Sequence, residues 1–172
     1  MIKILEAATS AALPEAAAFR DAMAEVASAA HLVTTTSPGG RAGLTATAVA
    51  SVSDAPPTLL VCIEAGSRTL AAIEAMGFFC VNTLSAEDHE LAEAFSGRGG
   101  LVGEARFTKG SWTRLSTGAP VLRSALVAFD CRLVAAHAVA THKVLIGEVV
   151  ALGGGGGTGE SLVYRRRRFG GF

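Results

Sequence analysis

Apolar residues first recur along the chain at helical spacing. Phe19, Met23 and Val26 lie three or four residues apart and so share one face of a helix. Pro14 is suited to a first helical turn, and the surrounding alanines are strong helix formers. The pattern therefore predicts an N-terminal helix over about residues 14–29.

Beyond this helix the pattern changes to β-branched runs and to alternation of period two, which predicts strands. Residues 31–37 and 42–53 flank the turn sequence Ser-Pro-Gly-Gly-Arg and together are typical of a β-hairpin. Further strands are predicted at 58–65, 78–85, 142–152 and 161–169, with one strand or a bent pair at 121–139. Short helices are predicted at 67–76 and 86–96.

The order of these elements favours an antiparallel arrangement. A parallel sheet needs a crossover helix between most of its strands, and residues 31–65 and 121–169 offer none. The expected fold is mainly β (α+β): an antiparallel barrel over about residues 31–169 with short helices packed outside it. The length favours a single domain spanning residues 1–172.

Composition and charge narrow the classes of function. Of the 172 residues, 50% are apolar and 17% are charged, which excludes a disordered chain. The 15 basic residues balance the 15 acidic ones, so no nucleic-acid partner is expected. No run approaches the ~20 apolar residues of a transmembrane helix, so no membrane partner is expected either. Low surface charge weakly favours burial in a dimer.

Cysteine usage and the N-terminus bear on the compartment. Cys62, Cys80 and Cys131 are scattered and each lies in an apolar run, which predicts small buried side chains, not disulfides or a metal site. Residues 1–18 are apolar, but acidic residues and a proline interrupt them before a signal-peptide core of useful length forms. A reducing, cytoplasmic location is therefore expected.

Two conspicuous runs do not fit the chemistry that they first suggest. Gly154, Gly156 and Gly159 match G-x-G-x-x-G, but the thirteen residues that follow are typical of a strand, so a dinucleotide-binding βαβ unit is excluded. The arginine run 165–168 would alternate between two faces in a strand. A phosphate contact or a charged edge strand is favoured there over nucleic-acid binding.

Residues 43–51 indicate a surface that a flat ring can approach. In one extended strand Thr45, Thr47 and Ser51 would share a face with Val49, and small alanines would occupy the other face. Small side chains let a ring lie near the backbone, whose amides and hydroxyls can bond its edge. An ordinary half-buried strand, with threonine chosen for β propensity, is the alternative.

Residues 64–70 indicate a phosphate site. A strand ends, Gly66 turns the chain, and Ser67, Arg68 and Thr69 begin a helix whose free N–H groups attract anions. A guanidinium binds phosphate through two N–H groups. Simple capping of the helix by Ser67 is the alternative. None of the four histidines has metal-ligand spacing, and His142, just before a strand, is kept as a candidate.

These pieces together resemble the short flavin reductases with the split β-barrel FMN-binding fold. That family includes the reductase components of two-component monooxygenases, such as those of 4-hydroxyphenylacetate and phenol hydroxylases. The resemblance extends from about Phe19 to Phe169. Its landmarks, in order, are FRDAMAEVASAAHLVTTT, GLTATAVASVSDAPPTLLVCI, SRT, FFCVNTLS, LAEAFSG, RF at 106–107, GAPVLRSALVAFDC, HKVLIGEVV and LVYRRRRF.

The resemblance implies roles for individual residues. A flavin would be FMN, or FAD, and the reductant NADH or NADPH. The residues implied are Thr45, Ala46, Thr47, Ala48 and Ser51 along the flavin ring, Cys62 and Ile63 beside it, Ser67, Arg68 and Thr69 at the phosphate, Phe95 at the ring edge, His142 beside the nicotinamide, and Tyr164 and Arg168 closing the pocket. A homodimer with the flavin near the subunit interface is also implied.

The implied function is an NAD(P)H-dependent flavin reductase that supplies reduced flavin to a partner monooxygenase. Two alternatives stay open: reduction of a corrin in cobalamin synthesis, and a flavin- or haem-binding protein without turnover. Because the cofactor carries the hydride chemistry, no acid–base constellation is needed. The glycine-rich loop 153–159 and the arginine run depart from the family pattern, and the arginines offer a site for the 2′-phosphate of NADPH.

Overall fold

The computed structural model describes residues 13–98, 100–157 and 159–171. The first twelve residues of the N-terminal segment considered above as a signal peptide lie outside the described residues. Within the described ranges, no helix is long and apolar enough to cross a membrane.

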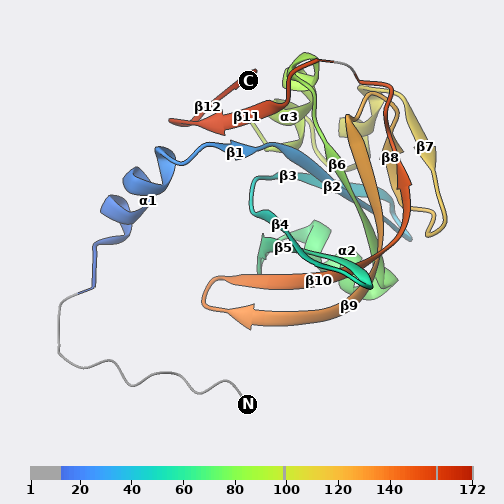
Figure 1. Cartoon of the computed structure of the whole chain (residues 1–172), viewed down its shortest axis with the longest axis horizontal. Coiled ribbons are helices and arrows are strands. Elements are labelled where there is room, and N and C mark those ends of the chain that lie inside the picture. Colours follow the sequence, from blue (N-terminus) through green and yellow to red (C-terminus); the bar gives the residue numbers. More distant parts are fainter. Residues whose placement is uncertain (1–12, 99, 158, 172) are drawn as a thin grey trace.

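A curled antiparallel sheet forms the centre of the molecule (Figure 1). Within the described residues it has seven strands in the order β3-β2-β6-β9-β10-β5-β4. They are β2 (His31–Ser37), β3 (Gly40–Ala46), β4 (Val49–Asp54), β5 (Pro57–Glu64), β6 (Phe78–Thr83), β9 (Val127–Val139) and β10 (His142–Gly153). The edge strands β3 and β4 are joined by residues 47–48 alone, so the sheet must curl until its edges meet.

Smaller strands and short helices surround this sheet (Figure 1). β1 (Ser28–Ala29), β11 (Leu162–Arg165) and β12 (Arg168–Gly171) form one small sheet, and β7 (Trp112–Arg114) pairs with β8 (Pro120–Leu122). The helices are α1 (Ala16–Ala24), α2 (Arg68–Met76), α3 (His89–Phe95) and the 3₁₀ turns η1 (Ala86–Asp88) and η2 (Gly103–Thr108). The prediction of a mainly β, antiparallel fold with short peripheral helices is confirmed.

Helix α2 shows why the local predictions succeeded. Ser67 caps it, its hydroxyl accepting from the Leu70 N–H at 3.4 Å, and Gly77 ends it in the left-handed conformation at φ 75°. Leu70 and Ile73 on its inner face are buried against the sheet core, which also holds Phe79. The predicted helix over 67–76 is therefore confirmed, with Ser67 as its cap.

The N-terminal helix is shorter than predicted. It ends at Ala24, with Glu25 as the C-cap, and residues 28–29 instead pair with β11 as strand β1. Periodicity alone overextended the helix, because alanine-rich residues carry no stop signal. Phe19 and Met23 do share its apolar side, but they remain 61% and 49% exposed. That side therefore has no partner within the described part of this chain.

Two predicted strands are interrupted. The single strand expected over 42–53 is broken at residues 47–48, so the expected alternation of hydroxyl and alanine faces does not run through. The final strand expected over 161–169 is a hairpin, β11–β12, whose turn residues Arg166 and Arg167 have φ of 49° and 60°. Positive φ at both central residues is the geometry of a two-residue hairpin turn. The segment 121–139 resolves into β8 and β9, the expected bent pair.

Candidate functional site

The break between β3 and β4 opens into a cavity of about 510 Å³, here named the strand-gap cavity. Elements far apart in the sequence supply its walls. Its lining residues are Leu44, Thr45, Ala46, Thr47, Ala48, Cys62, Ile63, Glu64, Ser67, Phe95, Ser96, Arg106 and His142. The cavity therefore brings together most of the side chains that the resemblance implied for the flavin ring and the nicotinamide.

The backbone at residues 47–48 gives this cavity its polar edge. These two residues lie outside the ladders that pair β3 with β2 and β4 with β5. The Ala48 carbonyl accepts from the Cys62 N–H at 3.0 Å, which fixes the gap against β5. Alanine side chains at 46 and 48 keep this edge shallow, so a flat ligand can approach the backbone amides.

Thr45 and Phe95 form part of the wall of the strand-gap cavity. The Thr45 hydroxyl donates to the Ala92 carbonyl of α3 at 2.7 Å, so it anchors the helix instead of offering its proton to a ligand. Phe95, at the end of α3, is 1% exposed and packs edge-on against Phe107 with ring centroids 4.9 Å apart. A Cβ on Gly43 would lie 2.9 Å from the Phe95 ring, so glycine allows this close packing.

A second cavity of about 510 Å³, here named the arginine cavity, continues from the first. The two share Leu44, Ser67 and Arg106 as lining residues. Arg68 and Thr69 at the start of α2 line the second cavity. The cap residue and the first turn of α2 thus lie where the phosphate argument expected them.

Arg106 is the site residue that pattern reasoning did not assign. Its guanidinium donates to the carbonyls of Leu101 at 3.0 Å, Gly43 at 3.2 Å and Phe95 at 3.4 Å, which fixes its position. Burial lowers the pKa of Arg106, and the positive charge of Arg68 lowers it further. Two cations that repel each other across one cavity are a donor set suited to an anion such as phosphate.

The missed residue had only a weak signal in the sequence. Arg106 belongs to the dipeptide at 106–107 that is one landmark of the family resemblance. It lies far from Arg68 in sequence, in the 3₁₀ turn η2, so no spacing rule connects the two residues. Only the packing of η2 against β3 brings them to one cavity.

His142 is the first residue of β10 and lies at the strand-gap cavity. It pairs in register with Glu64 of β5, and both residues line the strand-gap cavity. Its Nδ1 is 2.9 Å from the Thr141 hydroxyl, which fixes the ring orientation. The arrangement leaves an exposed imidazole beside the strand-gap cavity, whose lining does not include Arg68.

Three expected site residues lie elsewhere within the described chain. Ser51 lies beyond the strand break and lines a separate apolar cavity on β4, so the break explains its absence from the groove. Tyr164 accepts a hydrogen bond from Arg98 at 3.0 Å and packs on Phe169 in the small β11–β12 sheet. Arg168 follows the hairpin turn in that same sheet. Neither cavity of the groove includes any of the three.

Two of the three cysteines match the expectation of small buried side chains. Cys80 and Cys131 are fully buried, and Cys62 lies partly exposed at the strand-gap cavity. Burial raises the pKa of the Cys131 thiol to about 12, so it stays protonated. Across the described residues, no three His, Cys, Asp or Glu side chains gather as a metal site.

Comparison with known proteins decides the family. The model of the flavin reductase like domain matches residues 23–172. The chain belongs to this flavin reductase family. An FMN reductase (NADH) RutF 1 of Methylorubrum extorquens is 53% identical over 161 residues, which are 93% of this chain and 79% of that protein.

Solved structures of flavin reductases have the same fold as this chain. A candidate flavin reductase from Haemophilus somnus superposes with a TM-score of 0.87 at 42% identity, covering 92% of this chain and all of that one. BorF, the flavin reductase component of a bacterial two-component tryptophan halogenase, gives 0.83 at 27% identity over 92% of this chain and 98% of BorF. The resemblance found in the sequence, including its oxidoreductase class, is therefore confirmed.

Proposed function

We propose that this chain is an NADH-dependent FMN reductase that supplies reduced flavin to a partner monooxygenase. The observation that carries the proposal is a pair of adjoining cavities, one with the backbone of residues 47–48 outside the strand ladders and the other with Arg68, while Arg106 lines both. The strand-gap cavity suits a flavin ring, and the arginine cavity suits a phosphate. The names of relatives about half identical to this chain support FMN and NADH.

The residues present fit a flavin mononucleotide. Arg68 and Arg106 would hold the phosphate, with the free N–H groups of the first α2 turn beside them. Ser67 lines both cavities and would bond the linker between phosphate and ring. When bound, the flavin supplies the acceptor for hydride from the dihydronicotinamide.

The protein's part in the reaction is to position groups and stabilise charge. Backbone N–H groups at residues 47–48 would donate to the ring edge and so favour the negative charge that arrives with the hydride. Alanines 46 and 48 let the ring reach them. His142 would place the nicotinamide at the open end of the strand-gap cavity. This division of labour does not require the protein to supply a paired acid and base.

The direct test is turnover. Purified protein with FMN and NADH is expected to oxidise NADH, followed by absorbance, and to deliver reduced flavin to a separate monooxygenase or to oxygen. FAD and NADPH serve as comparison substrates. Absence of turnover with every pairing of flavin and nicotinamide would overturn the proposed function.

A variant at the nicotinamide end tests the role of His142. His142→Ala is expected to raise the KM for NADH several-fold while leaving the affinity for FMN unchanged, because His142 does not line the arginine cavity. His137→Ala is the matched control, an exposed histidine on the neighbouring strand β9. Equal KM values for NADH in His142→Ala and His137→Ala would show that His142 does not bind the nicotinamide.

We also infer a cytoplasmic homodimer. Helix α1 exposes Phe19, Met23 and its neighbour Val26 together. A largely apolar cavity of about 480 Å³ lies elsewhere, lined partly by Leu59, Phe129 and strands β4 and β10. Apolar surfaces of this kind are covered in oligomers more often than left to water. The three cysteines are free, which agrees with a reducing compartment.

A further inference from the structure

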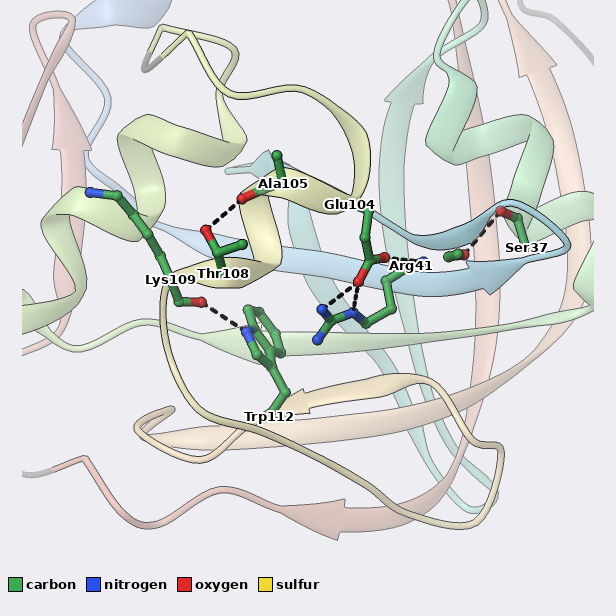
Figure 2. A network of polar contacts seen from close by, with 8 residues as sticks. Ser37, Arg41, Glu104, Ala105, Thr108, Lys109 and Trp112 are labelled. Atoms are coloured by element: carbon green, nitrogen blue, oxygen red, sulfur yellow. Dashed lines mark hydrogen bonds and ion pairs between the residues drawn. The ribbon is translucent and has the colours of Figure 1, made fainter.

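A salt bridge stands at the outer end of the arginine cavity. Arg41 near the start of β3 meets Glu104 of η2, as Figure 2 shows. The Glu104 carboxylate accepts from the Arg41 backbone N–H and from its Nε, each at 2.6 Å, and Nη2 pairs with the same carboxylate. Two bonds from the side chain and one from the backbone fix the carboxylate in place.

The pair is packed on one side, with 30% of the Arg41 side chain and 49% of the Glu104 side chain exposed. The Arg41 guanidinium lies over the Phe107 ring at 4.7 Å, and that ring is buried among aromatic neighbours. A Cβ at Gly40 would lie 2.9 Å from Glu104 Oε2, and Gly40 has a φ of 113°. Glycine therefore lets the carboxylate lie close against the β2–β3 turn.

The pair divides two cavities. Beyond it lies a third cavity of about 710 Å³, here named the tryptophan cavity, lined by Trp112, Arg114, Pro120 and neighbours. Ser37, Arg41 and Glu104 line both this cavity and the arginine cavity. Figure 2 shows Trp112 beneath the pair, its Nε1 donating to the Lys109 carbonyl at 2.8 Å. A ligand that extends outward from the phosphate position toward this space meets the Arg41–Glu104 pair.

The charges are arranged to receive one phosphate. The hydrogen bond from Arg41 lowers the pKa of the Glu104 carboxyl, so this group is ionised at neutral pH. Arg41 is already neutralised by Glu104, which leaves Arg68 and Arg106 for the ligand. A second phosphate placed further out would meet a neutral pair instead of a free guanidinium, so it would gain no net charge attraction from Arg41.

We propose that the Arg41–Glu104 pair is a specificity determinant that favours FMN over FAD. FMN ends at its single phosphate, whereas FAD continues through a second phosphate into adenosine and would have to pass the pair. The pair obstructs the larger flavin and withholds the Arg41 charge from its second phosphate, a common means of rejecting a competing ligand. This inference rests on the proposed flavin reductase function.

The test compares both flavins in wild-type protein and in variants. Glu104→Gln keeps the shape but removes the charge, and Glu104→Ala also opens the wall and releases Arg41 for a second phosphate. The preference for FMN over FAD is measured twice, as the ratio of Kd values from flavin-fluorescence titration without nicotinamide and as the ratio of kcat/KM values. Both ratios are expected to fall by about fivefold or more in Glu104→Gln, because Arg41 is then free to attract the second phosphate. A larger fall is expected in Glu104→Ala.

Glu90→Gln is the matched control, because Glu90 forms an exposed ion pair with Lys109 outside the groove. Its flavin ratio is expected to equal that of the wild type. A wild-type preference for FAD, or an unchanged ratio in both Glu104 variants with FMN turnover intact, would overturn the inference. Loss of all turnover in the wild type would instead overturn the proposed function, so the two failures are distinct.

Discussion

At the scale of single residues, Gly147 marks the tightest point of the sheet core. A Cβ there would lie 2.5 Å from Phe79 Cζ and 3.0 Å from Cys131 Cβ, at an irregularity in the β9–β10 register. Gly147→Ala is expected to lower the free energy of unfolding by about 1–3 kcal/mol, as overpacked cores do. Urea unfolding of the variant and the wild type measures this difference in free energy. Gly66→Ala, with open space around the site, should stay within about 0.5 kcal/mol of wild type.

His31 is predicted to make stability depend on pH. Burial lowers its pKa from 6.5 to about 4, and its Nδ1 lies 3.1 Å from the Thr83 hydroxyl. Between these pH values the unfolded chain binds a proton that the folded chain does not, so stability falls as pH drops from about 6.5 to about 4. The contribution is on the order of 3 kcal/mol.

Substitution isolates that contribution. In His31→Gln the fall in unfolding free energy between pH 7 and pH 4.5 should be smaller than in wild type, measured by urea titration at each pH. His137→Gln replaces an exposed histidine of β9 and serves as the control. Its fall in unfolding free energy between pH 7 and pH 4.5 should equal that of the wild type. Parallel curves for wild type and His31→Gln would show that His31 is not the source.

Residues also show where sequence reasoning reached its limit. Ser67 and Arg68 were predictable because a strand end, a turn and a helix start are local features. Arg106 was not assigned, because its position depends on contacts with Gly43 and Phe95 that no local pattern encodes. Thr45 does line the strand-gap cavity, but its hydroxyl bonds to α3.

At the scale of elements, the arginine run explains the placement of α1. Glu25 at the end of that helix accepts from Arg165 and Arg166, and Arg167 pairs with Asp21. The run was expected to be a strand with a phosphate contact or a charged edge. Its two central residues instead form the hairpin turn, and three of the four arginines meet acidic partners. The period-two pattern concealed this turn, because arginine is not a typical residue at positive φ.

This anchoring leads to a prediction for the helix. With its acidic side tied to the hairpin, α1 presents Phe19 and Met23 outward. Phe19→Ser combined with Met23→Ser is expected to convert the proposed dimer into a monomer, as measured by analytical ultracentrifugation. The variant should still fold in the absence of FMN. Arg20→Ser, on the same exposed helix, should stay dimeric. A dimer in the double variant would place the interface elsewhere.

At the scale of the whole molecule, the fold class followed from the chain because the missing crossover helices admit only an antiparallel arrangement. The groove did not follow, because it depends on closure of the sheet at residues 47–48. A break of two residues inside an alternating run has no composition signal. The same closure brings α2, α3 and η2 round one opening, so the two cavities proposed for the ring and for the phosphate adjoin each other.

The rise in stability on flavin binding tests whether the two cavities act as one site. Bound flavin should raise the unfolding free energy by about 2.7 kcal/mol at a hundred times its Kd. At equal flavin concentration, FMN is expected to raise the melting temperature more than riboflavin, which lacks the phosphate. Arg68→Ala should remove most of that difference while leaving the riboflavin shift unchanged, because the ring end is intact. Arg123→Ala, exposed and outside both cavities, should behave as wild type. If Arg68→Ala lowered both shifts equally, the two cavities would not divide ring from phosphate as the groove suggests.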